Sequence, residues 1–330
     1  MIEIDKKTIS EWTRLGMRKA FGPILERIAD NHPELIALTA DVAESANLIS
    51  FSKNHPSQFF DVGIAEQNMT GIACGMAKEG HNVFICSFAP FVSMRNYEAV
   101  RTLVGYMGSN VKVIALSSGL SLGVQGSTHY CLEDISLMRT IPGMLVLSPT
   151  DVVEEAKCVE FLANYSGPAY LRLTGIDGTP NVFNSDYTFD EGGVELIRDG
   201  EDCVIISTGS VTSECVRATR ALKKDGINCA LYSVCKLKPI DEAKFSFILN
   251  RYKTVVVVEE HFKIGGLGDI VSDVVATRGL QCKVIKIGIN DNFPHPGDYA
   301  HVLSVNGLTA SDIRNTIVFE KKSNMEDKNE

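Results

Sequence analysis

The stretch Asp61-Val-Gly-Ile-Ala-Glu-Gln-Asn-Met69 places one acidic side chain, Glu66, at the start of a helical run. From Ile64 to Lys78 this run is otherwise small and apolar, apart from two amides and the final lysine, so we expect a buried helix. Burial disfavours the ionised form of a carboxyl group and leaves it able to hold or share a proton, as proton-transfer chemistry requires. The alternative is an acidic residue that complements the helix dipole.

Further motifs lie on both sides of this stretch. They are Phe60-Asp-Val-Gly-Ile-Ala-Glu-Gln-Asn68, Ser87-Phe-Ala-Pro-Phe91, Gly126-Ser-Thr-His129, Leu132-Glu-Asp-Ile135, and Ile141-Pro-Gly143 through Ser148-Pro-Thr-Asp151. Their order and spacing resemble the transketolase family, in the C-terminal-subunit form found when the enzyme is split over two chains. The resemblance continues through Gly265-Gly-Leu-Gly268 and covers most of residues 10–320. One such motif is weak support, whereas the set is strong.

Composition describes a globular protein of 330 residues, with 45% hydrophobic and 22% charged residues. This length is enough for two domains of ordinary size. A net charge of −9 without a basic cluster argues against a nucleic-acid or anionic-membrane surface. Nine cysteines without Cys-x-x-Cys spacing indicate reduced core residues. With a charged opening segment and apolar runs of strand length only, we expect a cytoplasmic protein that does not span a membrane.

Strand-like and helical patterns alternate along the chain, which predicts an α/β fold with two domains and mostly parallel sheets. The resemblance implies a thiamine diphosphate pyrimidine-binding domain at 1–174, followed by a linker at 175–190. A transketolase C-terminal-like domain follows at 191–320, and a charged tail at 321–330. We expect strands at 35–39, 82–87, 111–117, 144–147, 169–173, 194–198, 203–207, 227–233, 254–259 and 283–287. Helices are expected at 8–30, 64–78, 91–106, 132–140, 151–164, 212–224, 241–250, 266–278 and 310–318.

The resemblance also implies a cofactor, thiamine diphosphate, that lies between two chains. In the family, one domain holds the diphosphate through Mg²⁺ with a Gly-Asp-Gly motif and a later Asn. No Gly-Asp-Gly occurs here, and the nearest string, Ile176-Asp-Gly178, lies in the predicted linker. We therefore expect an N-terminal transketolase-like partner subunit that carries the diphosphate and Mg²⁺ site, in an α2β2 heterotetramer, and we expect no metal ligand in this chain.

What the resemblance assigns to this chain is the pyrimidine side of the cofactor. Glu66 would donate a hydrogen bond to the aminopyrimidine ring nitrogen, which favours the tautomer that removes the thiazolium proton. Phe88 and Phe91 match aromatic residues that pack on the pyrimidine ring, although core aromatics are the alternative explanation. Met94 stands where the family often has Tyr, which keeps packing but removes a hydroxyl group. Ile64 completes this predicted set of contacts.

Three further residues are assigned to the thiazolium and the substrate. Asp41 and Ser45 follow a predicted strand end, where open α/β sheets place ligands, and match a segment that lines the thiazolium and the substrate entrance. An ordinary capped loop is the alternative for this segment. By resemblance, His129 lies beside the donor carbon, where its imidazole would bond the donor hydroxyl or carbonyl group and move protons. Glu66 and His129 are thus the predicted catalytic residues.

This chain departs from the family around the acceptor. Ser117 stands where the family usually has His, Gln125 where it commonly has Asp, and the phosphate-binding arginine is replaced near Gly175, although Arg172 remains nearby. Charge-assisted contacts to phosphate are strong, so their loss changes acceptor recognition. We expect an acceptor whose phosphate is absent or lies elsewhere, such as an unphosphorylated or nucleotide-linked sugar. The predicted substrate contacts are Ser45, Ser117, Gln125, His129 and Arg172.

The predicted reaction is transfer of a two-carbon ketol unit from a ketose to an aldehyde or ketone acceptor, with activity only in the presence of the partner. One alternative is a β subunit of a 2-oxoacid dehydrogenase, which shares the architecture and the glutamate. Another is a non-catalytic regulatory subunit of the same fold. The presence of Glu66 argues against the second, and the Gly126–His129 and Leu132–Ile135 motifs favour transketolase over the first.

Overall fold

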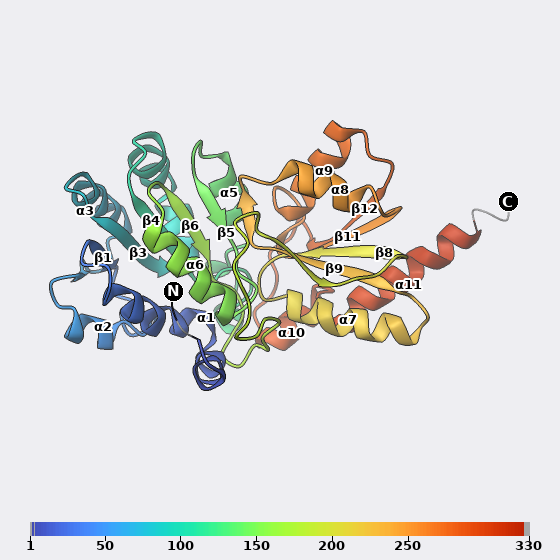
Figure 1. Cartoon of the computed structure of the whole chain (residues 1–330), viewed down its shortest axis with the longest axis horizontal. Helices are drawn as coiled ribbons and strands as arrows, with labels where there is room; N and C mark the ends of the chain where they lie inside the picture. The colour runs from blue at the N-terminus through green and yellow to red at the C-terminus, as the bar shows by residue number, and fades with distance from the viewer. Residues whose placement is uncertain (1, 3, 327–330) are drawn as a thin grey trace.

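The computed structural model describes residues 2 and 4–326, which form two α/β units placed side by side (Figure 1). The first unit is built on a seven-stranded sheet in the order β10-β5-β6-β4-β3-β1-β2. Every strand but β10 runs parallel to its neighbours. These strands are β1 Leu35–Thr39, β2 Phe59–Asp61, β3 Asn82–Phe88, β4 Val111–Leu116, β5 Leu145–Leu147, β6 Ala169–Arg172 and β10 Lys236–Lys238.

Helices cover both faces of this sheet, and apolar side chains fill the layer on each side. The central strands are buried along nearly their whole length, as expected of continuous apolar runs in parallel sheets. The helices are α1 Lys6–Ala29, α2 Ile49–Asn54, α3 Glu66–Lys78, α4 Tyr97–Ala99, α5 Asp134–Thr140 and α6 Val152–Asn164. Two π-helical segments, η1 Phe91–Arg95 and η2 Val100–Tyr106, flank α4, and a 3₁₀ segment, η3 Gly123–Thr128, follows β4.

A break at Gly16 divides α1. Gly16 has φ of 66°, and a Cβ atom there would lie 2.8 Å from the carbonyl carbon and oxygen of Ile176. Only glycine accommodates both this backbone conformation and this close approach. The break thus brings the residues after Gly16 next to the segment that follows β6, a contact that matters for the site below.

The second unit is a five-stranded sheet in the order β12-β11-β8-β9-β7, in which only β7 is antiparallel to its neighbour. The prediction of two α/β domains with mostly parallel sheets is therefore confirmed. The strands are β7 Val194–Arg198, β8 Cys203–Ser207, β9 Cys229–Val234, β11 Thr254–Phe262 and β12 Lys283–Ile289. The helices are α7 Thr212–Lys224, α8 Glu242–Leu249, α9 Leu267–Arg278, α10 Tyr299–Val305 and α11 Ala310–Glu326.

Several elements were not predicted, namely the short strands β2 and β10 and the helices α2 and α10. Strand β10 lies beyond the predicted linker in sequence, yet it pairs antiparallel with β5 and so joins the first sheet. Helix α11 runs through Glu326, into the segment predicted as a charged tail, and residues 327–330 lie outside the described residues.

All nine cysteines are free thiols, and every one except the half-buried Cys282 is buried. Of the helices in the described part of the chain, not one combines the length and apolar character that a membrane crossing requires.

Candidate active site

Several predicted binding residues gather at the carboxyl edge of the first sheet. Asp41 follows β1, Phe88 ends β3, Ser117 follows β4 and Gly175 follows β6, and these strands are neighbours in one parallel arrangement. Open parallel sheets bind ligands at this edge because the loops that leave adjacent strands diverge there. Residues that are far apart in the sequence therefore come together around one rim.

Glu66 lies at the N-terminal end of α3 with only 4% of its surface exposed. The hydroxyl group of Ser87 donates to its Oε1 at 3.3 Å, and the guanidinium of Arg95 donates to its Oε2 at 3.2 Å. The carboxyl group is thus buried as predicted, but it also has a cationic partner that the sequence analysis missed. Arg95 is half exposed, so this ion pair sits at the border between the protein and solvent.

The rest of α3 corrects the expectation of a buried helix. One face, which includes Glu66, Met69, Thr70, Ala73 and Cys74, packs into the first unit. The opposite face is exposed and carries Gln67, Asn68, Gly71, Gly75 and Lys78.

Aromatic rings form a cluster beside Glu66. The ring of Phe91 lies 6.5 Å from that of Phe88, at 86°, and 5.4 Å from the imidazole of His129, at 72°. The guanidinium of Arg95 lies 4.2 Å from the centre of the Phe91 ring and thereby links this cluster to Glu66. The structure therefore brings Glu66, Phe88, Phe91 and His129 together, from elements that lie between residues 66 and 129 of the chain.

The remaining predicted cofactor contacts differ in accessibility. Ile64, just before α3, is 74% exposed, whereas Met94 is half buried and packs against the first core. Asp41 is exposed, has φ of 59°, and its N–H group donates to the Asp61 carboxylate at 3.0 Å. Ser45 is half buried in the loop that follows. This rim is open to solvent in the isolated chain.

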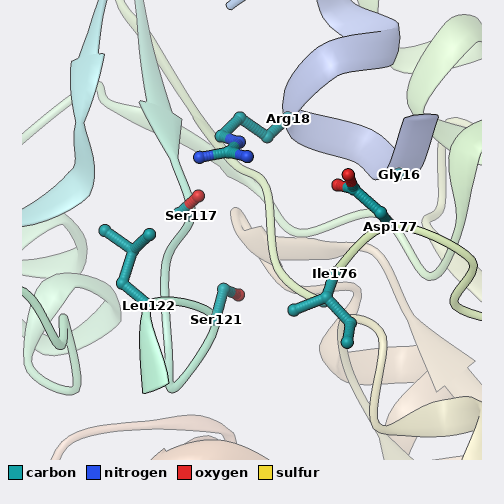
Figure 2. Close-up of a pocket in the computed structure, with 8 residues that line it drawn as sticks. Gly16, Arg18, Ser117, Ser121, Leu122, Ile176 and Asp177 are labelled. Carbon is teal, nitrogen blue, oxygen red and sulfur yellow. The ribbon is translucent and has the colours of Figure 1, made fainter. Parts of the chain in front are cut away.

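A separate cavity of about 230 Å³ lies next to Ser117 (Figure 2). Segments from three parts of the chain line it: the Gly16 break in α1, the loop after β4, and residues 175–177. Ser117 is buried at the wall and has φ of 55°. The lining residues are Gly16, Arg18, Ser117, Ser121, Leu122, Gly175, Ile176 and Asp177. The predicted contact Gln125 is exposed and is absent from this lining.

Arg18 is a candidate binding residue that the sequence analysis did not identify. Within residues 2 and 4–326 no hydrogen bond or ion pair engages its guanidinium, because the neighbouring Lys19 takes the Asp177 carboxylate at 2.7 Å. Figure 2 shows the Arg18 side chain extending toward Ser117. The sequence held one signal for this position: Gly16, two residues earlier, interrupts a pattern that is otherwise typical of a helix. The cavity thus has one unpaired cation.

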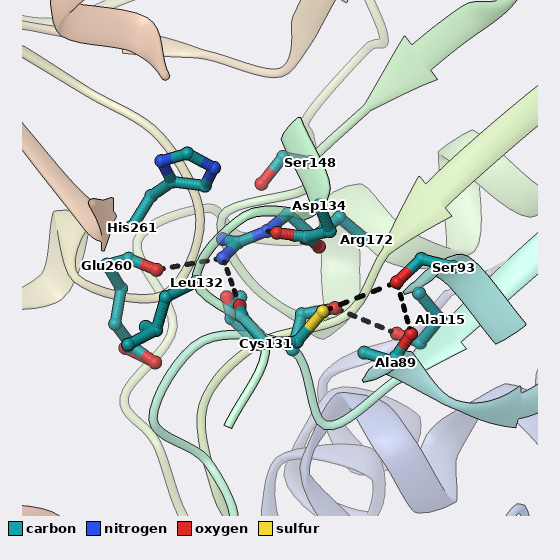
Figure 3. Close-up of polar contacts among 12 residues, drawn as sticks. Ala89, Ser93, Ala115, Cys131, Leu132, Asp134, Ser148, Arg172, Glu260 and His261 are labelled. Carbon is teal, nitrogen blue, oxygen red and sulfur yellow. Dashed lines mark hydrogen bonds and ion pairs between the residues drawn. The ribbon is translucent and has the colours of Figure 1, made fainter. Parts of the chain in front are cut away.

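Arg172, a predicted substrate contact, is not among the residues that line this cavity. Its side chain is completely buried, and its Nε donates to both Asp134 oxygens, at 3.0 and 2.9 Å. Its Nη2 donates to the Glu260 carbonyl oxygen at 2.8 Å (Figure 3). Its Nη1 has no hydrogen-bond partner in the described part of the chain, and the whole side chain is closed to solvent. The substrate contact of Arg172 therefore stays a prediction, and we propose a structural role for its pair with Asp134.

The Glu66 cluster fits one side of a flat, nitrogen-containing ring. Phe88 and Phe91 offer apolar ring surfaces, and a buried carboxyl group in its acid form can donate to a ring nitrogen. In the described residues there is no group of three or more His, Cys, Asp or Glu side chains suited to a metal ion. The side chains of the Glu66 cluster themselves offer hydrogen bonding, ring packing and proton transfer.

Comparison with known proteins matches each of the two units to a family of domains. The family model described as "Transketolase, pyrimidine binding domain" matches residues 13–177, and "Transketolase, C-terminal domain" matches residues 192–313. The "Putative transketolase C-terminal section" of Methanocaldococcus jannaschii is 39% identical over 93% of this chain and 96% of its own length. One of the subunits of apulose-4-phosphate transketolase from Phocaeicola vulgatus is 33% identical over 93% of this chain and 98% of its own length.

Two solved structures show the same architecture. A chain described as "Split gene transketolase, inactive beta4 tetramer" superposes with a TM-score of 0.82 at 33% identity, covering 91% of this chain and 96% of that one. Transketolase from Campylobacter jejuni superposes with a TM-score of 0.74 at 22% identity, covering 95% of this chain but only 50% of that one. The second likeness concerns the fold alone.

Proposed function

This chain belongs to the transketolase family, and we propose that it is the pyrimidine-binding subunit of a split enzyme that transfers a two-carbon ketol unit. The observation that carries the proposal is the buried Glu66 carboxyl group beside the Phe88, Phe91 and His129 rings. Thiamine diphosphate, when bound, would supply the reactive carbon that accepts the two-carbon unit. The residues of this chain would hold the cofactor ring and move protons around it.

Glu66 would donate a hydrogen bond to the ring nitrogen of the aminopyrimidine. In the isolated chain the Glu66 Oε2 atom accepts a hydrogen bond from Arg95, so this oxygen already has a partner before a cofactor ring is bound. Cofactor binding would therefore replace the contact between Arg95 and Glu66. Phe88 and Phe91 would pack on the ring, with Ile64, Met94 and Asp41 as further contacts of the cofactor.

His129 is suited to act on the substrate. Its imidazole is half exposed, contacts the Phe91 ring edge, and has Nδ1 2.9 Å from the Thr128 hydroxyl group. That arrangement leaves Nε2 to bond a hydroxyl or carbonyl oxygen of the ketose and to transfer a proton during cleavage of the carbon–carbon bond.

We propose that the diphosphate and Mg²⁺ bind to an N-terminal partner subunit, and that the two chains form an α2β2 heterotetramer in the cytoplasm. Support comes from relatives described as a single subunit or a C-terminal section of a transketolase, and from a related β tetramer described as inactive. The exposed face of α3 and the exposed Ile64 are surfaces that a partner would cover. Free thiols in the core suit a reducing compartment.

Calorimetric titration of thiamine diphosphate tests this arrangement. The isolated chain should show no tight Mg²⁺-dependent binding, and the reconstituted pair should bind the cofactor and turn over a ketose. Tight binding to the isolated chain would contradict the need for a partner. A reconstituted pair that binds the cofactor but transfers no ketol unit would contradict the reaction.

For the acceptor, we propose a sugar that lacks the usual terminal phosphate or carries it elsewhere, such as an unphosphorylated or nucleotide-linked sugar. Ser117 and Gly175 line the cavity with no charge, and Gln125 lies outside its lining. Arg18 supplies one cation, which suits a single contact with an anionic group. One arginine gives weaker phosphate recognition than several cations acting together.

Steady-state kinetics of the reconstituted pair decides the acceptor class. Ribose 5-phosphate, glyceraldehyde 3-phosphate, glycolaldehyde and a nucleotide-linked keto sugar would be compared as acceptors. We expect the phosphorylated aldoses to be the poorer substrates. A kcat/KM for either of them on the order of 10⁴ M⁻¹s⁻¹ or more would show that Arg18 is sufficient for the phosphate and that the acceptor proposal is wrong.

A further inference from the structure

The loop at residues 117–129, which we call the substrate loop, lies against the second unit along most of its length. The Gly297 N–H group donates to the Gly123 carbonyl oxygen at 3.1 Å, and the Ser127 hydroxyl group donates to the Pro294 carbonyl oxygen at 3.1 Å. These bonds join the middle of the loop to the segment before α10. The loop that carries predicted substrate contacts is thus held from a domain with no predicted substrate contact of its own.

Glu260, on β11, holds the start of the substrate loop. Its carboxylate is almost completely buried, and its Oε1 accepts a hydrogen bond from the Leu120 N–H group at 2.7 Å. Its Oε2 accepts a hydrogen bond from the Tyr299 hydroxyl group at 2.6 Å. The Glu260 backbone is held as well, through its carbonyl contact with Arg172 (Figure 3). A buried carboxylate is stable only when its oxygens have donors, so the loop and Glu260 depend on each other.

Glycines of the loop face the second unit at three positions. A Cβ atom at Gly119 would lie 2.3 Å from Glu260 Oε1, and one at Gly123 would lie 2.4 Å from the Gly297 carbonyl oxygen. One at Gly126 would lie 3.1 Å from the Pro296 side chain. Any larger residue at the first two positions would push the loop and the second unit apart. The loop is therefore shaped to fit this surface.

Glu259 provides an internal comparison, because it is equally buried and adjacent on the same strand. Its two carboxylate oxygens accept hydrogen bonds from Leu267 N–H at 2.7 Å and Gly268 N–H at 2.8 Å, at the start of α9. Successive residues of a strand point to opposite faces, so Glu259 stabilises a helix of its own domain while Glu260 reaches the substrate loop.

We propose that Glu260 is a positioning residue of the substrate site, through which the C-terminal domain holds the loop in the shape that presents Ser117 and His129. The kinetic part of this inference rests on the proposed function. Loss of one contact with a charged group is enough to let a loop move, and a displacement of about 1 Å at a reacting group can lower the rate about 10²-fold.

The test compares Glu260→Gln with the matched variant Glu259→Gln, each in the complex with the partner subunit. Leu120 and Tyr299 donate to different oxygens of Glu260, so glutamine places its one oxygen at only one of these positions and its NH₂ group at the other. We expect Glu260→Gln to speed amide hydrogen exchange about tenfold within residues 117–129 and to raise the acceptor KM about tenfold. Proton exchange at the thiazolium carbon should stay unchanged, because Glu66 is not held by this loop. Glu259→Gln should change none of these quantities by more than about twofold.

Two further variants keep the inference testable if Glu260→Gln does not fold. Tyr299→Phe removes one donor to Glu260, and Tyr252→Phe is its control, since the Tyr252 hydroxyl group bonds to Gly200 far from the loop. Amide hydrogen exchange in residues 117–129 that is faster in Tyr299→Phe but not in Tyr252→Phe supports the inference. The inference is overturned if exchange in this loop is equal in Glu260→Gln and Glu259→Gln and also equal in the two tyrosine variants. Hydrogen exchange needs no turnover, so a complex that fails to transfer ketol units would contradict the proposed function and still decide the role of Glu260.

Discussion

The Glu66 cluster and the Arg18 cavity lie on the same rim of the first sheet but are built in different ways. The Glu66 cluster comes from separate elements within residues 66–129 and is open, and Ile64, just before α3, is 74% exposed. The Arg18 cavity is lined by three segments that are distant in sequence. The first region is the one that we propose a partner chain completes, whereas this chain alone lines the second.

Each region also has one arginine, in opposite electrostatic situations. Arg95 is paired with the Glu66 carboxylate and lies over the Phe91 ring, whereas Arg18 has no partner in the described part of the chain. The guanidinium of Arg95 is already bonded to a carboxyl group, whereas an unpaired guanidinium in a cavity is free to bind an anion. The following variants test this difference, from the largest expected effect to the smallest.

Glu66→Gln should lower turnover of the reconstituted enzyme roughly 10²- to 10⁴-fold, because an amide keeps the volume but cannot act as the acid. Proton exchange at the thiazolium carbon, followed by NMR, should slow together with turnover. Glu79→Gln, at the exposed opposite end of α3, is the control and should behave like the wild type. If both rates of Glu66→Gln stay near the wild type, Glu66 only complements a helix terminus.

His129→Asn should lower kcat about 10²-fold with ketose donors while leaving thiazolium proton exchange intact. A lower kcat with unchanged proton exchange distinguishes a residue that acts on the substrate from one that activates the cofactor. Pre-steady-state measurement of donor cleavage provides the readout, and His81→Asn, in the turn after α3, serves as the control. If donor cleavage and thiazolium proton exchange slow equally, His129 would act on the cofactor, as Glu66 does, and not on the substrate.

Arg18→Met should raise KM for anionic acceptors about tenfold or more and leave KM for glycolaldehyde within about twofold. The reason is that only an anionic group would use the unpaired guanidinium. Arg14→Met, one turn earlier on α1 and exposed, is the matched control. A uniform change across charged and neutral acceptors would show that Arg18 shapes the cavity without binding an anion.

Arg95→Met should tighten thiamine diphosphate binding by the reconstituted pair, by no more than about fivefold. Removal of the guanidinium leaves the Glu66 carboxyl group free for the cofactor ring, and a half-exposed ion pair contributes only about 0–1 kcal/mol. Calorimetric Kd values for this variant and for Arg101→Met, an exposed arginine six residues later, measure the effect. Weaker binding in Arg95→Met alone would mean that Arg95 contacts the cofactor itself.

Much of the first region could be predicted from sequence, because its signals are local. Glu66, Phe88, Phe91 and His129 lie in short motifs, and strands β1, β3 and β4 are continuous apolar runs. The exposure of one face of α3 could not be predicted in this way. The glycine and alanine residues of α3 allow another element to pack closely against the helix. Their pattern does not show whether that element belongs to the same chain or to another one.

The amino-acid sequence by itself determined the two α/β units, the order of most strands and helices, and the carboxyl group beside an aromatic cluster. Only the tertiary structure decided that Arg18 faces Ser117, that Arg172 is buried against Asp134, and that Glu260 reaches the substrate loop. The physical reason is separation along the chain. Secondary structure follows from neighbouring residues, whereas each of these three arrangements depends on which distant segments the fold brings together.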